Sequence, residues 1–225
     1  MLTNHTSAKP PSRNLLAGIF LVLCSVLVGI AGSTDASAAG RRPGHVYLMR
    51  GVLNVFSLGM DDIAYKLQAT GVAASTQNYL GWRGLADDII ANYRGGNREP
   101  IILMGHSAGA DATIDVARRL QGSGVPVALI VNFDPVSPAP VPPNVAQIVN
   151  YYVPAGWGAA VAPDRRFKGK LANVNESSSD NHFTIDKSED LQSKAIAKVL
   201  QVVGGSAHRA PRKRAGAQVS AAAAQ

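Results

Sequence analysis

Residues 100–110 place the strictest demand on how this chain can fold. The apolar residues before Gly105 are typical of a buried strand, and the Ala-rich residues after Ser107 have helical spacing. The sequence between them, Gly-His-Ser-Ala-Gly, matches G-x-S-x-G, which presents a serine on a tight turn from strand to helix. Backbone segments come close at such a turn, so Gly105 and Gly109 are expected for steric reasons. The helix N-terminus beneath the turn favours an anion forming at the serine, which makes Ser107 a candidate nucleophile.

Strand-like and helical segments alternate along the rest of the chain. This alternation predicts a three-layer α/β domain, with a mostly parallel sheet and helices on both faces. The near-continuous apolar run at 127–133 is typical of a strand covered on both faces. The expected strands are 45–49, 72–79, 101–104, 127–133, 147–153 and 171–175, and the expected helices are 59–70, 84–93, 107–120 and 188–203.

The first 38 residues have the pattern of a secretory signal peptide. Lys9 and Arg13 precede an apolar run at 15–31, and a small-residue site ends at Ala38, where we expect cleavage. This predicts a periplasmic or secreted protein; the alternative is an uncleaved N-terminal anchor, which would then be the chain's contact with a membrane. Cys24, the one cysteine, lies in the apolar run, so the mature chain would form no disulfide and use no thiol in catalysis.

The net charge of +7 is concentrated at the C-terminus. Residues 206–225 carry four basic and no acidic side chains, whereas residues 39–205 are nearly balanced. The Ala-rich tail has too few large apolar residues to bury itself, so we expect it to be disordered and to follow a catalytic domain at 39–205. Four charges are a weak basis for nucleic-acid binding, and no nucleic-acid partner is expected.

A serine needs a base to accept its proton. His182 is the expected base, because it lies between the last strand and the last helix, at the sheet edge to which Ser107 projects. The other four histidines are excluded by their positions. His5 lies in the expected signal peptide and His208 in the tail. His45 lies at the opposite sheet edge, and His106, next to the serine, has its ring turned away from it.

The acid that orients the base should lie between Ser107 and His182 in the chain. Asp134 is preferred, because it ends the strand beside the serine strand and lies at the same edge. Asp164, after the strand at 147–153, is the alternative.

Two backbone amides are needed to stabilise the negative charge of an acyl-transfer intermediate. Ala108, directly after the serine, would supply one of them. Val52, in the loop after the first strand, is expected to supply the other, with Leu53 as the alternative.

Over about residues 45–203 the chain resembles the α/β-hydrolase superfamily, and small secreted bacterial lipases, esterases and thioesterases are the nearest subset. Gly-His-Ser-Ala-Gly at 105–109 is the G-H-S-x-G form common in lipases and thioesterases, and Phe133-Asp134-Pro135 is similar to the acid-bearing corner of some lipases. Arg50-Gly51-Val52 stands where many members have His-Gly, so Arg50 departs from the pattern. The resemblance implies a serine hydrolase of carboxylic esters or thioesters that uses no metal or organic cofactor.

The connection at 134–146 is short and rich in proline, which leaves no room for a lid. We therefore expect a minimal cap and an open site suited to bulky or polymeric acyl substrates. Two other classes of function stay open: a non-catalytic envelope protein that uses this fold for binding or scaffolding, and a transacylase or amidase with the same triad. The candidate lining residues are Leu53, Phe56, Trp82, Trp157 and Phe183.

Overall fold

Six parallel strands form the central layer of the structure, a computed structural model that describes residues 40–52 and 54–209. The strands lie in the order β2-β1-β3-β4-β5-β6, and every neighbouring pair is parallel. Their bounds are β1 Arg42–Arg50, β2 Val72–Asn78, β3 Ile101–His106, β4 Leu129–Phe133, β5 Gln147–Tyr152 and β6 Lys170–Asn175.

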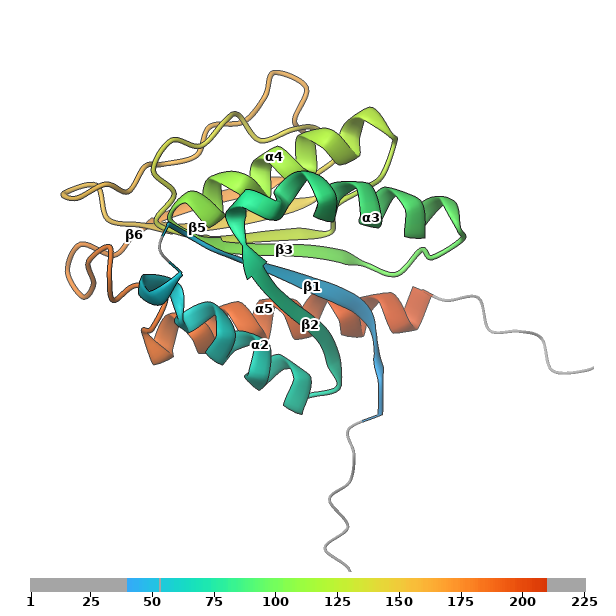
Figure 1. The fold of residues 1–225 in the computed structure, drawn as a ribbon, viewed down its shortest axis with the longest axis horizontal. Coiled ribbons are helices and arrows are strands. Elements are labelled where there is room, and N and C mark those ends of the chain that lie inside the picture. The colour runs from blue at the N-terminus through green and yellow to red at the C-terminus, as the bar shows by residue number, and fades with distance from the viewer. Residues whose placement is uncertain (1–39, 53, 210–225) are drawn as a thin grey trace, which may run out of the picture. The chain divides into compact units, whose positions relative to one another are not determined.

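Helices cover both faces of the sheet, as Figure 1 shows, with α3 and α4 on one face and α2 and α5 on the other. This confirms the expected three-layer fold. The helices are α2 Gly59–Ala69, α3 Trp82–Arg94, α4 Ala108–Gly122 and α5 Glu189–Arg209, and two short 3₁₀ turns are η1 Val55–Ser57 and η2 Tyr79–Gly81.

Side chains of the buried strands alternate between two hydrophobic cores, because successive residues of a strand point to opposite faces. In β3, Ile102 and Met104 pack on the α2 and α5 face, whereas Ile101 and Leu103 pack on the α3 and α4 face. β3 is buried along its whole length, which explains the unbroken apolar run that precedes Gly105.

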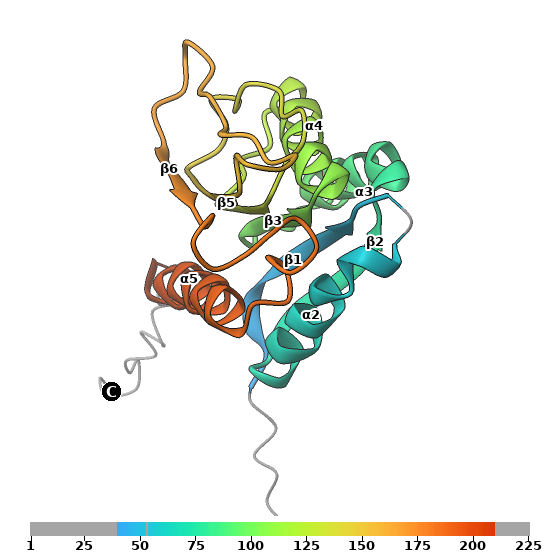
Figure 2. The ribbon, with the colours of Figure 1, turned by 90° about the vertical axis from the view of Figure 1, so that its left-hand side faces the viewer.

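The strand order places a natural binding position at the carboxyl ends of β1 and β3. The chain leaves β1 toward α2 on one face and leaves β3 toward α4 on the other, although the two strands are neighbours. In open α/β sheets, ligands bind at such a switch point. Figure 2 turns this edge toward the viewer, with the orange connection between β6 and α5 lying at it. The loop after β1 and the turn at Ser107 also lie there.

The element boundaries differ from the expected ones mainly at the ends. β1 begins three residues earlier than predicted, and Val127, expected to open β4, forms an isolated bridge to Val145. α5 continues past the predicted end at residue 203 to Arg209, so residues 206–209 are helical rather than part of the tail. Gly204 and Gly205 do not end the helix, because glycine lowers helix propensity but keeps its backbone donor and acceptor.

Three predictions fall wholly or mainly outside the described residues. They are the signal peptide or anchor at 1–38, the tail from residue 210 onward, and Leu53. Within residues 40–52 and 54–209, no helix is both long and apolar enough to cross a membrane.

Candidate active site

Ser107 occupies a strained turn between β3 and α4. Its φ of 58° and ψ of −130° are unusual for a residue with a side chain. A Cβ on Gly105 would lie 2.3 Å from the carbonyl oxygen of Gly109, and one on Gly109 would lie 2.1 Å from that of Met49. Both glycines are therefore required by close backbone approach, for the steric reason that the sequence pattern implied.

The side chains of Ser107, His182 and Asp134 form a hydrogen-bonded series. Nε2 of His182 lies 3.1 Å from Oγ of Ser107, and Nδ1 of His182 lies 2.6 Å from Oδ2 of Asp134. An ionised carboxylate only accepts, so Nδ1 carries the proton and Nε2 of the neutral ring is free to accept one from the serine. The structure brings these three residues together from the turn after β3, the end of β4 and the connection between β6 and α5.

Asp134 is fixed by its surroundings. It is fully buried, has a φ of 53°, and its second oxygen accepts a 2.6 Å hydrogen bond from the amide of Val153. Asp164, the alternative acid, instead accepts from the amide of Arg166 at 2.9 Å. The geometry therefore places Asp134, and not Asp164, against His182.

The loop after β1 passes directly over the serine. A Cβ on Gly51 would lie 2.9 Å from Cβ of Ser107 and 3.3 Å from its Oγ. The amides of Val52 and Ala108, the two expected anion donors, have no acceptor among the described residues. Arg50, at the end of β1, donates from Nε to Asp61 at 2.8 Å and from a second nitrogen to the same carboxylate. This pair ties the loop to the first turn of α2.

These observations decide the fold family. A serine on a strained strand-to-helix turn lies at the carboxyl edge of a parallel sheet, and the acid and the histidine follow it in the chain. A serine on such a turn, with partners in the order Ser, Asp, His, is typical of one fold. The chain adopts the α/β-hydrolase fold.

No protein-family model matches this chain, and no curated protein matches it. Among solved structures, it is similar to the type II thioesterase BorB from the borrelidin biosynthetic cluster, with 12% identity, a TM-score of 0.49, and 72% of this chain and 92% of that chain covered. It is also similar to a cutinase-like protein from Cryptococcus sp., with 12% identity and a TM-score of 0.48; the match covers 74% of this chain and 98% of that chain. For human thioesterase 2 the identity is 10% and the TM-score is 0.47, and the match covers 72% of this chain and 97% of that chain.

A second histidine, His106, lies beside the candidate active site. It is almost fully buried, and its ring turns away from Ser107, as expected. Its nitrogens contact Oγ of Ser57 and the backbone oxygen of His182, both at 2.8 Å. Burial lowers the pKa of His106 below its usual value. No sequence pattern pointed to Ser57, because only the fold brings η1 next to the end of β3.

Exposed aromatic side chains surround His182. The ring of Trp157 meets the imidazole edge-on at 5.0 Å and the ring of Phe183 at 5.7 Å, and Phe183 also contacts Phe56 at 5.5 Å. Trp157 is 61% exposed, and Phe56 and Phe183 are close to half exposed. The aromatic rim, meaning Phe56, Trp157 and Phe183, therefore offers an apolar surface beside the serine.

Trp82 is not placed in this rim. It is partly buried, and its side chain packs against the hydrophobic core between the sheet and helices α3 and α4. The connections at 134–146 and 153–169 contain no helix, in agreement with the expected minimal cap.

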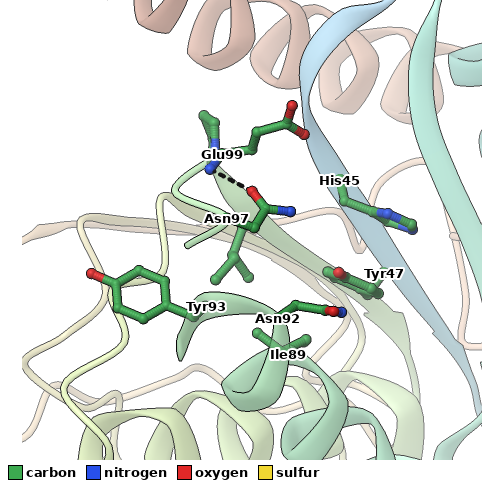
Figure 3. A pocket seen from close by; sticks show the side chains of 9 residues that line it. His45, Tyr47, Ile89, Asn92, Tyr93, Asn97 and Glu99 are labelled. Atoms are coloured by element: carbon green, nitrogen blue, oxygen red, sulfur yellow. Dashed lines mark hydrogen bonds between the residues drawn. The ribbon is translucent and has the colours of Figure 1, made fainter. Parts of the chain in front are cut away.

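The other polar cluster with a histidine lies at the opposite sheet edge (Figure 3). His45, which pairs with the first residue of β3, stacks on Tyr47 and has Nε2 2.9 Å from Oγ of Ser75. His45 and Tyr47 also line a pocket of about 20 Å³, which has room for water only. At the same pocket, the amide of Glu99 donates to Oδ1 of Asn97. No group of three or more potential metal ligands occurs in residues 40–52 and 54–209.

Proposed function

We propose that the chain is a serine hydrolase that cleaves carboxylic ester or thioester bonds through an acyl-enzyme intermediate. Ser107 is the nucleophile, His182 the general base and acid, and Asp134 the residue that orients His182. One observation carries the proposal: a buried carboxylate, an imidazole and a strained serine are connected at 2.6 Å and 3.1 Å at the open edge of the sheet.

Acylation begins when Oγ of Ser107 attacks the carbonyl carbon of the substrate. Nε2 of His182 accepts the hydroxyl proton, and the imidazolium is stabilised by the carboxylate of Asp134 at Nδ1. The carbonyl oxygen becomes an oxyanion between the amides of Ala108 and Val52, close to the N-terminus of α4. When the intermediate collapses, Nε2 returns the proton to the departing alcohol or thiol.

Deacylation repeats the same proton transfers with water as the nucleophile. His182 removes a proton from water, which attacks the acyl carbon, and Nε2 then protonates Ser107 as the free acid leaves. Every proton that moves is accepted and returned by the same nitrogen, and the residues described supply all the acid–base groups that these steps need.

For the substrate we propose a bulky apolar acyl group, and two features support this choice. The aromatic rim exposes large side chains next to His182. The connections at 134–146 and 153–169 contain no helix that would close over the acyl chain. An acyl chain laid on the rim would gain about 25 cal/mol for each Å² of apolar surface removed from water.

The test compares residues 39–225 with Ser107→Ala on a chain-length series of p-nitrophenyl esters and acyl thioesters. We expect turnover that disappears in the variant and rises with acyl length. Equal turnover in the two proteins would remove the proposed role of Ser107. If neither protein hydrolyses any ester or thioester of the series, a fluorophosphonate probe separates two explanations. Labelling of Ser107 would mean that the right substrate was not in the series, whereas a non-catalytic binding protein would not be labelled. Hydroxylamine or an alcohol as competing acceptor would reveal a transacylase.

A further inference from the structure

A continuous series of hydrogen bonds joins the backbone of Gly51 to the backbone of His182. The amide of Gly51 donates to Oγ of Ser57 at 2.9 Å, Ser57 contacts Nδ1 of His106 at 2.8 Å, and Nε2 of His106 contacts the carbonyl oxygen of His182 at 2.8 Å. Ser57 is fully buried and His106 is 1% exposed, so water does not compete for these bonds.

The two ends of the series fix the directions of its first and last bonds. A backbone amide only donates and a carbonyl oxygen only accepts. Oγ of Ser57 accepts from the amide of Gly51 and also carries one proton, which it can donate to Nδ1 when the ring of His106 is neutral. Nδ1 then acts as the acceptor, and the ring proton lies on Nε2, where it donates to His182. With a neutral ring each link uses one proton, and the burial of His106 favours that neutral ring.

This series connects three segments that each carry part of the proposed machinery. Gly51 precedes Val52, the proposed anion donor; His106 precedes Ser107, the nucleophile; and His182 is the base. The rings of His106 and His182 are also in contact, with their centres 5.0 Å apart. A shift of His106 would therefore move the base and the anion site relative to the serine.

We infer that His106 is a positioning residue of the proposed hydrolase, acting in its neutral form with the proton on Nε2 to hold the Gly51–Val52 segment and His182 in place around Ser107. The inference rests on the proposed function. It assigns to the histidine of the Gly-His-Ser sequence a task that the triad residues do not perform.

The surroundings of His106 agree with this role. The charged and titratable groups that act on it are Asp186, Lys187 and His182. Asp186 is paired with Lys187 at 3.0 Å, so its negative charge is partly compensated. Burial lowers the pKa of His106 by penalising the charged ring. A proton on Nδ1 would also leave the hydroxyl proton of Ser57 without its acceptor in a buried place.

The experiment breaks the series at two different links. Ser57→Ala removes the link to Gly51 and leaves Nδ1 of His106 without a donor. His106→Asn keeps a polar group near Nδ1 but cannot reach the carbonyl of His182. Ser75→Ala is the matched control, because it also removes a serine bonded to a histidine, at the far edge of the sheet. Lys187 donates to the carbonyls of Phe56 and Phe183, and none of the three substitutions removes these bonds, so we expect the two loops to stay folded.

Positioning is measured by fluorophosphonate labelling of Ser107 and by ester hydrolysis. In Ser57→Ala and His106→Asn we expect labelling to reach the full extent but about 10- to 100-fold more slowly, with kcat reduced by a similar factor and KM little changed. Ser75→Ala should match the parent protein. A purely structural role would reduce the extent of labelling, in proportion to the unfolded fraction, and not the rate.

A spectroscopic reading tests the protonation state separately. Long-range ¹H–¹⁵N correlation of the histidine rings at pH 7 should show His106 as the neutral form with the proton on Nε2. The opposite tautomer, an imidazolium, or labelling rates of both variants within twofold of the parent protein would overturn the inference. If one variant does not fold, the other tests the same series. A parent protein that is not labelled at all would overturn the proposed function as well, so the two failures are distinguishable.

Discussion

Nδ1 of His182 donates a 2.6 Å hydrogen bond to the fully buried carboxylate of Asp134, although 48 residues separate the two in the chain. The other oxygen of that carboxylate is held by the amide of Val153. Asp134 therefore has no freedom to turn away, and it fixes both the tautomer and the plane of the imidazole.

Replacing Asp134 with Asn should reduce kcat by about 10⁴-fold with little change in fold, because an amide can donate to Nδ1 and favours the wrong tautomer. The Val153 bond can persist, since the remaining oxygen still accepts. Steady-state kinetics with a p-nitrophenyl ester measure the loss. Asp164→Asn is the control and should keep activity within about twofold, because Asp164 bonds to the amide of Arg166. If Asp164→Asn shows the larger loss, the proposed acid is wrong.

Replacing Gly51 with Ala should lower kcat by about 10²-fold. The added methyl would lie 2.9 Å from Cβ of Ser107, so the loop must move away from the serine and carry the amide of Val52 with it. Gly84→Ala is the matched control, because a Cβ there meets no atom within 4 Å. In the control we expect unchanged activity and a gain of about 0.5–1 kcal/mol in the free energy of unfolding, since Gly84 lies in α3. A fully active Gly51→Ala protein would argue against an anion site in this loop.

Asp111 should make the protein less stable as the pH rises through about 6. Its carboxylate accepts from the amides of Val136 and Ser137, which follow Asp134, but burial raises its pKa from 3.8 to about 6. A group with a raised folded pKa binds more protons in the native state, so its stabilising contribution is present below pH 3.8 and is lost as the pH passes about 6. Asp111→Asn should therefore gain stability relative to the parent protein as the pH rises from 3.8 to about 6, with no further gain above that pH.

Urea unfolding of both proteins across this pH range measures that difference. Taking the difference cancels the opposite contribution of His106, whose lowered pKa costs stability as the pH falls below about 6.5. Asp62→Asn, at an exposed position in the first turn of α2, controls for the loss of one negative charge. A difference between Asp111→Asn and the parent protein that does not grow with pH would contradict the prediction.

Replacing Trp157 with Ala should reduce activity on long acyl chains more than on short ones. Trp157 is 61% exposed and lies against both His182 and Phe183, so its loss shortens the apolar surface beside the serine. We expect kcat/KM for p-nitrophenyl octanoate, relative to the acetate, to fall about tenfold. Tyr65→Ala, an aromatic residue on α2 that is even more exposed, should leave this ratio unchanged. An equal effect on both esters would place the acyl chain elsewhere.

Much of the fold was predictable because its signals are local. Apolar runs, helical spacing and glycine stops predicted every strand and every α-helix of the described residues, and the fold class followed from their alternation. Ser107 was identified from five consecutive residues. The sequence favours Asp134 and His182 because parallel strands end at one sheet edge, so their positions in the sequence predict their positions in space.

Other features have no local signal. The connection of Ser57 to His106 spans 49 positions, and that of His106 to His182 spans 76. Trp82 looked equally suited to the site and to the core, and only the packing of α3 against α4 assigns it to the core. Arg50 departs from the family pattern, and its pairing with Asp61 explains what the arginine does there.

The sequence by itself thus determined which elements form, in which order, and that Ser107, His182 and one of two aspartates reach the same edge, because hydrophobic periodicity and turn chemistry act over a few residues. Only the tertiary structure decided between Asp134 and Asp164, joined His106 to both the base and the loop after β1, and placed the aromatic rim around His182. Those outcomes depend on contacts between segments far apart in the chain. Such contacts form only when the sheet and its two cores bring the loops together.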